Sequence, residues 1–399
     1  MRVLFTTHAT SGHFHPLVPL AKALEAAEHE VAFVTSEFFR QSVEASGFEC
    51  LPGGYDLDTH WSEATFETLF PEYAAIPQGL EKMRWMASNI FAGLMLEQMV
   101  PDLQDHVEEC KPDLLVREPS EFSAGIVGEK LAIPYATAGW PLFFPHELWL
   151  DLVGKELNEI RAEYGLPVDD QLEMLHPYLY MAFAPPEFAG DPEHFPPTAH
   201  LFRPVPFDRS GDEDLPDWID DLPDQPTIYA TLGTVFNDEP GVFEMIIDAF
   251  RDESVNLIMT VGRNQDPNRF HPLPDHIRVE RYIPQSLLLP YCDLVIAHSG
   301  YNTVVNVLGA GLPMLSVPIG GDQVEQAGPG VQMGAAIMVP PNDRSTDAIR
   351  EGARKLLADP SYRENAEQFR DRLRAMPGPD QAVALLEQLA RDQKPIFRS

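Results

Sequence analysis

The most informative stretch of the sequence is HSGYNTVVNVLGAGLPMLSVPIGGDQ, which runs from His298 to Gln323. An apolar run at 293–297 comes just before it, and a second apolar run occupies 314–317. Short apolar runs bounded by glycine and proline are typical of strands buried in a parallel sheet. The residues between the two runs predict a short helix. The stretch is therefore expected to form a strand, a helix and a second strand of one parallel sheet.

The start of the predicted helix is suited to bind an anion. Ser299, Gly300 and Asn302 favour a sharp turn of the backbone, and the first turn of a helix leaves several N–H groups without partners. Such a helix end carries about half a positive charge and is a common site for phosphate. The His298 ring can add an N–H donor, and Asn302 and Thr303 can add side-chain donors. The sequence therefore predicts a phosphate site here.

A second loop of the same stretch supplies groups that bind hydroxyls. After Pro318 the chain returns to the same edge of the predicted sheet with Asp322 and Gln323. A carboxylate and an amide can both hydrogen-bond to the hydroxyl groups of a polyol. One loop is therefore expected to hold phosphates, and the next to hold a sugar.

Together with residues just upstream, this stretch resembles the nucleotide-sugar-binding signature of GT-B glycosyltransferases. It is most similar to the bacterial branch that glycosylates antibiotics and other natural products of the macrolide and enediyne type. The upstream residues are Tyr282-Ile-Pro-Gln285. The resemblance implies that Tyr282 stacks on the base and that the Ile283 backbone and Gln285 read its edge. It also implies that His298 contacts a phosphate and that the pair at 322–323 holds the sugar.

The diphosphate is expected to bind without a metal ion. Gly233 and Thr234, which follow a predicted strand, resemble the family's second phosphate contact. No acidic pair of the DxD type lies where a metal would bridge a diphosphate, and the donors at a helix end can substitute for a cation. We therefore expect a metal-independent, inverting transfer, with the nucleotide-sugar as a substrate and no cofactor.

His13 is the candidate general base. Transfer to an alcohol or phenol needs a base near the acceptor's proton, and an ordinary imidazole titrates near pH 6.5. His8, His13 and His15 lie in one loop, so position alone does not choose among them. The resemblance chooses His13. It also implies a carboxylate partner at the end of the strand that follows the Pro-Asp dipeptide at 112–113. The family usually has Asp at that position and this chain has Glu118, with Asp113 as the weaker substitute.

Composition excludes several kinds of partner. The chain has 399 residues, of which 44% are hydrophobic and 10% aromatic, and this fits two globular domains of about 200 residues each. Its 28 basic and 62 acidic residues give a formal net charge of −34, so neither nucleic acid nor an anionic membrane is expected as a partner. The three cysteines form no metal-binding cluster, no run approaches 18 apolar residues, and a strand begins at Arg2. A cytoplasmic protein is expected.

The sequence predicts two α/β domains. In the first half, strands expected at 3–7 and 31–35 flank a helix that begins at Pro16, which indicates a doubly wound parallel sheet. The loop at 8–15 lies at the carboxyl end of a strand, where ligands bind, and it lacks the G-x-G-x-x-G pattern of a dinucleotide-binding oxidoreductase. Residues 185–226 carry ten prolines and eleven acidic residues and predict an extended interdomain linker.

The resemblance to GT-B enzymes implies a complete domain plan. Two Rossmann-like, doubly wound domains would face each other across a cleft. The acceptor-binding domain would span 1–207 and the nucleotide-sugar-binding domain 208–379. The helix at 380–399 would cross back to the first domain.

Large apolar side chains in the long connections of the first half point to a hydrophobic acceptor site. Any single such residue is more often part of the core, but an excess of aromatic and methionine side chains in connections can also line a cleft. The candidates for acceptor contact are Phe14, Trp61, Phe66, Trp85, Phe91, Trp140 and Phe144.

The expected activity is transfer of a sugar or deoxysugar from a dTDP- or UDP-sugar to a hydroxyl of a hydrophobic aglycone such as an antibiotic. Two alternatives stay open, because some GT-B relatives are non-catalytic partners or activators of another transferase and others are sugar-nucleotide epimerases. An epimerase would need no aromatic acceptor site, and its sugar would stay on the nucleotide. The sequence also leaves open whether the protein forms a homodimer.

Overall fold

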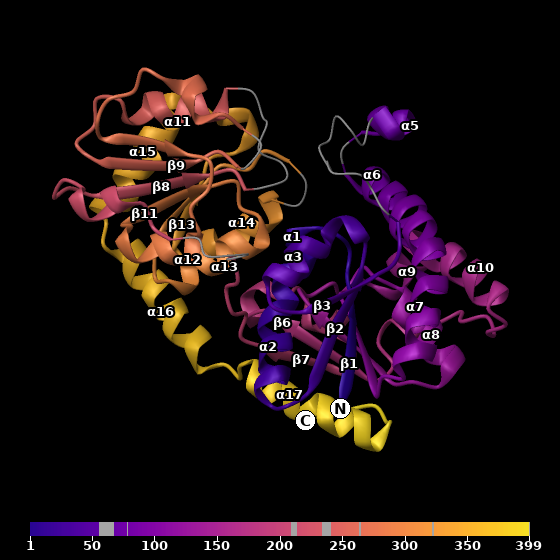
Figure 1. Ribbon diagram of the computed structural model, residues 1–399. Helices are drawn as coiled ribbons and strands as arrows, with labels where there is room; N and C mark the ends of the chain where they lie inside the picture. Colours follow the sequence, from indigo (N-terminus) through magenta and orange to yellow (C-terminus); the bar gives the residue numbers. More distant parts are fainter. Residues whose placement is uncertain are drawn as a thin grey trace. The chain divides into compact units, whose positions relative to one another are not determined.

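The computed structural model describes residues 1–55, 68–77, 79–208, 214–233, 241–262, 265–320 and 323–398. The chain divides into two compact units, Met1–Gly211 with Met376–Ser399 and Asp212–Ala375 (Figure 1). The first unit therefore contains both ends of the chain. The sequence predicts domain boundaries after residues 207 and 379. In the structure the chain passes from one compact unit to the other after residues 211 and 375.

The first unit is built on a seven-stranded parallel sheet with the strand order β3-β2-β1-β4-β5-β6-β7. Its strands are β1 (Arg2–Thr6), β2 (Glu30–Thr35), β3 (Glu49–Pro52), β4 (Leu114–Arg117), β5 (Tyr135–Gly139), β6 (Leu179–Phe183) and β7 (Ala199–Phe202). Its helices include α1 (Ser11–Phe14), α2 (Val18–Ala26), α3 (Arg40–Ala45), α5 (Pro71–Ala74), α6 (Leu80–Trp85), α7 (Leu96–Cys110), α8 (Ser123–Leu131), α9 (His146–Trp149), α10 (Lys155–Glu163) and α17 (Pro379–Asp392), with π-helical turns at Met86–Met95 and Leu150–Gly154.

Helices cover both faces of this sheet. In β1, Val3 and Phe5 join a core that includes side chains of α2 and α17, while Leu4 joins a second core with α7, α8 and α10. Successive side chains of a strand point to opposite faces, so a strand buried on both sides must be apolar throughout. This explains why the strands appear in the sequence as continuous apolar runs.

The second unit contains a six-stranded parallel sheet with the order β10-β9-β8-β11-β12-β13. Its strands are β8 (Thr227–Thr231), β9 (Asn256–Thr260), β10 (Ile277–Glu280), β11 (Leu294–Ala297), β12 (Met314–Ser316) and β13 (Ala336–Met338). Its helices include α11 (Val242–Phe250), α12 (Gln285–Leu288), α13 (Tyr301–Gly309), α14 (Gln323–Gln332), α15 (Thr346–Ala358) and α16 (Ser361–Ala375). Both units are Rossmann-like parallel-sheet domains, and the predicted α/β fold class is confirmed.

The strand order places one ligand-binding position in each sheet. In the first sheet β1 lies between β2 and β4, and in the second sheet β8 lies between β9 and β11. The chain connections change direction between β1 and β4 and between β8 and β11. Ligands of open parallel sheets bind beyond the carboxyl ends of the strands at such switch points. The loops after these four strands are therefore the places to look for a site.

Residues 185–226 are not a uniformly extended linker. β7 lies in this range and pairs with β6 at the edge of the first sheet, and short 3₁₀ turns occupy Pro186–Phe188, Pro192–His194 and Asp217–Asp221. Proline is tolerated on or beside an edge strand, because one side of that strand needs no backbone N–H donors. A proline-rich composition was therefore compatible with a strand.

The C-terminal helix belongs to the first unit. α17 packs against α2, and its Val383, Leu386 and Leu389 are buried in the same core as β1 (Figure 1). Every helix among the described residues is too short or too polar to span a bilayer.

Candidate active site

His13 and Glu118 meet at the switch point of the first sheet. His13 lies on α1, in the connection that follows β1, and Glu118 is the first residue after β4. The Nδ1 atom of His13 is 3.1 Å from Oε1 of Glu118. The Glu118 side chain is fully buried, whereas the His13 side chain is 24% exposed. A carboxylate can only accept, so Nδ1 of His13 carries the proton and its Nε2 offers a lone pair.

The Glu118 carboxylate is held by several donors. The backbone N–H of Ser120 donates to Oε2 at 2.8 Å, and the Ser120 hydroxyl donates to Oε1 at 2.8 Å. Burial raises the pKa of Glu118. The neighbouring His13 and His8 and these hydrogen bonds lower it by more, so that the net pKa is about 2. Glu118 is therefore an anion at neutral pH, able to orient a base and to stabilise it when it is protonated.

His8 is a member of this cluster that the sequence analysis did not select. Its Nε2 atom is 3.2 Å from Oε1 of Glu118 and 3.2 Å from the carbonyl oxygen of Ser120. The side chain is 7% exposed and its ring packs against Phe91, with the ring centroids 5.0 Å apart. Burial lowers the pKa of His8, so its ring is neutral at neutral pH. The only signal in the sequence was its position directly after the first strand.

The same three side chains bear on whether a metal binds. The ligand-type atoms of His8, His13 and Glu118 lie within 4.8 Å of one another. Hydrogen bonds already engage them, because both imidazoles contact one oxygen of Glu118. The cluster is best described as a buried carboxylate between two imidazoles. Metal independence stays a prediction for experiment.

A buried arginine shapes the loop that carries Glu118. Arg117 is 1% exposed and its guanidinium donates to the carbonyl oxygens of Pro119 at 2.9 Å, Glu121 at 2.8 Å and Leu175 at 2.7 Å. These bonds fold residues 118–121 into a tight turn at the end of β4. The turn presents the Glu118 side chain toward the loop that follows β1.

Two predicted acceptor residues lie beside the imidazoles. Trp140 meets the His13 ring edge-on, with the centroids 4.9 Å apart and the planes at 84°. The centroid of Phe91 lies 6.1 Å from that of the His13 ring. A third candidate, Phe144, packs instead against Trp149, with the centroids 5.2 Å apart. An apolar wall therefore stands beside the exposed part of His13.

The other predicted acceptor residues have different surroundings. Trp85 packs with Phe70 and Tyr73, and these rings join Phe91 around the buried Ile90 and Met95. Phe14 is fully buried in the core against Phe33, so it offers no surface to an acceptor. It follows His13 on a short helix, and the next residue of a helix points away from its neighbour. Trp61 and Phe66 lie outside the described residues.

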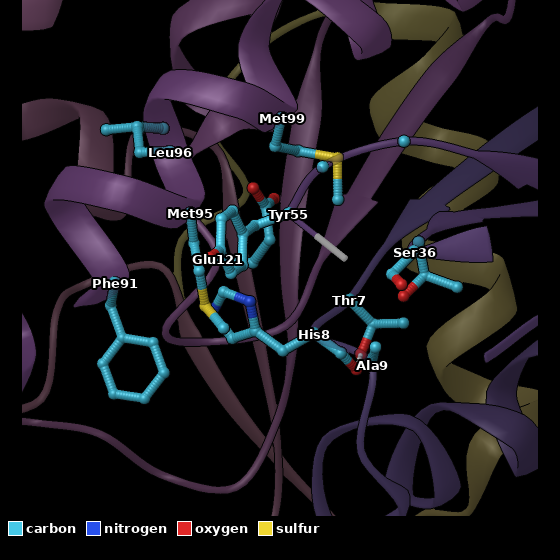
Figure 2. A pocket seen from close by; sticks show the side chains of 13 residues that line it. Thr7, His8, Ala9, Ser36, Tyr55, Phe91, Met95, Leu96, Met99 and Glu121 are labelled. Carbon is cyan, nitrogen blue, oxygen red and sulfur yellow. Dashed lines mark hydrogen bonds between the residues drawn. The ribbon is translucent and has the colours of Figure 1, made fainter. Parts of the chain in front are cut away.

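A small pocket adjoins the cluster on the side of His8 (Figure 2). Thr7, His8 and Glu121 contribute polar groups to the lining of this pocket. The apolar part of the lining consists of Tyr55, Phe91, Met95, Leu96 and Met99. Its volume is about 20 Å³, which is room for one water molecule. Glu121 is tied to the sheet, because its carboxylate accepts from the Thr6 hydroxyl and from the backbone N–H of Ser123.

In the second unit, His298 lies between two glycines. A Cβ atom placed on Gly233 would be 2.7 Å from Cε1 of the His298 ring, and one placed on Gly300 would be 2.7 Å from its Nε2. No side chain could replace these hydrogens without moving the ring. The loops after β8 and β11 thus hold the imidazole at the switch point of the second sheet.

The backbone after His298 makes the turn that the sequence predicted. Ser299 is fully buried and has a φ of 74°, the left-handed conformation that costs a non-glycine residue free energy. Gly300 caps α13 without a side-chain hydrogen bond to the first turn. The predicted donors Asn302 and Thr303 are in that first turn. Their backbone N–H groups point out of the helix N-terminus, as an anion site requires.

His298 is neutral at neutral pH. Burial lowers its pKa to about 4, and a backbone contact with Thr231 opposes this only in part. Its Nδ1 atom is buried without a hydrogen-bond partner. A neutral imidazole carries one N–H, so the ring can donate one hydrogen bond, either to the backbone oxygen of Thr231 or to a bound phosphate.

The remaining predicted donor-site residues differ in their surroundings. Gln323 begins α14 and is buried, and its Oε1 accepts from the backbone N–H groups of Ile319 at 2.8 Å and Gly320 at 3.1 Å. Gln323 therefore also shapes the loop after β12. Ile283 is buried, Gln285 begins α12 two residues later, and Tyr282 is half-buried. Thr234 and Asp322 lie outside the described residues.

Comparison with known proteins identifies the family. Residues 22–233 match the erythromycin biosynthesis protein CIII-like N-terminal domain, and residues 244–389 match the corresponding C-terminal domain. The chain is 28% identical to 4'-demethylrebeccamycin synthase of Lentzea aerocolonigenes, covering 97% of this chain and 99% of that one. It is 27% identical to 3-alpha-mycarosylerythronolide B desosaminyl transferase of Saccharopolyspora erythraea, covering 99% of each.

Solved structures agree with this assignment. Glycosyltransferase VinC, determined in complex with dTDP, superposes with a TM-score of 0.80 at 25% identity over 98% of this chain and 100% of that one. The glycosyltransferase SsfS6 of Streptomyces sp. SF2575, complexed with thymidine diphosphate, superposes with a TM-score of 0.76 at 25% identity over 97% and 99%. With both of its domains matched and glycosyltransferases as its relatives, the chain belongs to the erythromycin biosynthesis protein CIII-like family of glycosyltransferases.

Proposed function

We propose that the protein is an inverting glycosyltransferase that moves a sugar, in particular a deoxysugar, from a dTDP- or UDP-sugar to a hydroxyl of a hydrophobic natural-product aglycone. The observation that carries this proposal is the contact between His13 and the buried, anionic Glu118 at the switch point of the first sheet. Through this contact Glu118 orients the His13 ring at Nδ1, and Nε2 of the same ring can act as a general base.

In the proposed reaction, Nε2 of His13 takes the proton of the acceptor hydroxyl as its oxygen attacks the anomeric carbon. The bond from that carbon to the diphosphate breaks on the opposite side, so the configuration inverts. Glu118 stabilises the imidazolium that forms, because it stays ionised. The apolar wall of Trp140 and Phe91 is suited to hold a ring system beside the base.

We assign the diphosphate to the loops around His298. The helix N-terminus of α13 and the His298 N–H would stabilise the departing charge, and we propose that no metal ion or other cofactor is needed. Bound dTDP in VinC and thymidine diphosphate in SsfS6 favour a thymidine nucleotide. A cytoplasmic location would suit the unpaired thiols of Cys50, Cys110 and Cys292.

Nucleotide binding tests the donor assignment. Calorimetric titration of the purified protein with dTDP, UDP and NAD, each with and without a chelator, should show binding of dTDP, UDP or both that survives chelation. The tighter of the two names the donor class. If none of the three binds, or NAD alone binds, the nucleotide-sugar assignment fails. Loss of binding on chelation would leave the nucleotide site standing but refute metal independence.

The proposed acceptor class is tested by identifying the products of the reaction. Incubation with a dTDP-sugar and a panel of macrolide and anthracycline aglycones should give a glycoside by mass spectrometry, with anomeric configuration opposite to the donor's by NMR. A sugar altered but still attached to the nucleotide would instead identify an epimerase. Binding of nucleotide without any turnover would favour a non-catalytic partner protein.

Gly300→Ala should weaken dTDP binding. The new methyl group lies 2.7 Å from Nε2 of His298, while the φ of −61° at Gly300 accepts alanine without strain. The ring must move, so we expect the Kd to rise about 10- to 100-fold, or roughly 1.4 to 2.8 kcal/mol. Gly328→Ala is the matched control, because a Cβ there meets nothing within 4 Å, and its Kd should stay within about twofold. Equal Kd values for both variants would remove His298 from the phosphate site.

A further inference from the structure

We propose that His8 is a positioning residue of the active site, which shares the Glu118 carboxylate with His13 and so decides how firmly that carboxylate holds the base. The proposal rests on the proposed function, in which His13 is the base. Its support is geometric, because Nε2 of His8 and Nδ1 of His13 lie 3.2 and 3.1 Å from the same oxygen of Glu118.

The surroundings of His8 assign its tautomer. Both neighbours of Nε2, the Glu118 carboxylate and the carbonyl oxygen of Ser120, can only accept hydrogen bonds. A neutral His8 must therefore carry its proton on Nε2 and donate it between these two oxygens. The Nδ1 atom then carries the lone pair. His8 acts on the carboxylate as a neutral donor with a fixed direction.

Glu118 is thereby supplied with donors on both oxygens. His13, His8, the Ser120 N–H and the Ser120 hydroxyl all donate to it, and an ionised carboxylate has about four lone-pair sites. The two imidazoles and the Ser120 hydroxyl meet at Oε1 and the Ser120 N–H bonds to Oε2, so the carboxylate is held at both of its oxygens. Each donor also takes a share of its charge. His8 consequently fixes the carboxylate in place and moderates its attraction for a protonated His13.

The charged groups around His8 set the direction of the effect. From the end of β4 it faces Glu118 and Glu121, and from α1 it faces His13. Arg117 lies behind the two glutamates. If the His8 donor is removed, more of the Glu118 charge acts on His13. This favours the imidazolium form of His13, so the base is lost at a higher pH.

Two substitutions separate the donor from the bulk of the ring. His8→Phe keeps an aromatic ring against Phe91 but removes the N–H, whereas His8→Gln restores a donor at about the position of Nε2. We expect His8→Phe to lower kcat by about five- to tenfold, to change the acceptor KM less than twofold, and to move the acid limb of the kcat profile upward by roughly 0.5 to 1 pH unit. His8→Gln should return both kcat and the acid limb toward the wild type. His106→Phe, which removes an imidazole bonded to the Pro52 carbonyl, should change neither.

A second readout does not depend on turnover. NMR of protein labelled with ¹⁵N-histidine, at pH 7, should show His8 protonated on Nε2 and bare on Nδ1, and the Nδ1 signal of His13 should shift in His8→Phe but not in His106→Phe. A proton on Nδ1 of His8, a charged His8 ring, or an unmoved His13 signal would overturn the proposal. So would an unmoved acid limb in a folded His8→Phe enzyme. If the wild type transferred no sugar, the proposed function would fail, and the NMR result would still decide whether His8 shares Glu118.

Discussion

His13→Ala will lower kcat for sugar transfer by about 10²- to 10⁴-fold, the contribution of a positioned general base. The side chain removed is the exposed member of the cluster, so Glu118 keeps its bonds to Ser120 and His8 and the fold is preserved. The measurement is kcat over a range of pH with a dTDP-sugar and an aglycone that the wild type accepts. The fall in kcat at low pH that protonation of the base causes should be absent from this variant.

The control for this variant is nucleotide binding. His13 belongs to the first unit and the assigned diphosphate site to the second, so the Kd for dTDP should stay within about threefold. His106→Ala, in the same unit, should retain wild-type turnover. Turnover of His13→Ala within tenfold of the wild type would remove His13 from the role of base. Loss of dTDP binding would instead indicate misfolding.

Glu118→Gln is expected to have the second-largest effect, a fall in kcat of about 10²- to 10⁴-fold. The amide can donate to Nδ1 of His13, which drives the proton to Nε2, where the base needs a lone pair. It also cannot stabilise the imidazolium by charge. Glu118→Asp keeps the charge with a side chain one methylene shorter, so it should lose much less activity. If the amide and the shorter acid lost equal activity, reach and not charge would be the requirement.

Glu118→Gln should also change how the thermal stability of the protein depends on pH in the acidic range. The pKa of Glu118 falls from an ordinary 4.5 to about 2 in the folded protein, because its imidazole neighbours and hydrogen bonds outweigh burial. A lowered folded pKa stabilises the protein above about pH 4.5, and this contribution is lost as the pH falls through about 2. The difference in Tm between wild type and Glu118→Gln should therefore narrow as the pH falls from about 4.5 towards 2. A constant difference would mean that Glu118 is not held as an anion.

Much of the fold followed from the sequence because buried parallel strands are apolar on both faces. β1, β2, β8 and β11 could be recognised in this way, and the helix between β11 and β12 by its glycine-rich start. β7 was missed because its neighbours are prolines, and prolines beside an edge strand resemble those of a linker. Short strands at the edge of a sheet carry few residues from which a pattern could be read.

In the candidate site, too, some residues could be predicted from the sequence and others could not. His13 and Glu118 were selected by resemblance, and their contact at 3.1 Å depends on a turn that Arg117 folds from behind. No local pattern announces that buried arginine or the approach of His8 to Glu118. The contact of Arg117 with Leu175 spans 58 residues of the chain, and the contact of His8 with Ser120, beside Glu118, spans 112. Phe14 was misplaced because a pattern of aromatic residues does not tell which side of a four-residue helix faces the core.

The C-terminal helix α17 also sets the order in which the chain can be completed during synthesis. The first unit receives part of its core from Val383, Leu386 and Leu389, and the tail after the helix bonds through Ile396 to the Tyr178 carbonyl. The second unit is continuous in sequence, so it can fold as soon as it leaves the ribosome. The domain that is translated first therefore receives the last part of its core only after α17 has been synthesised.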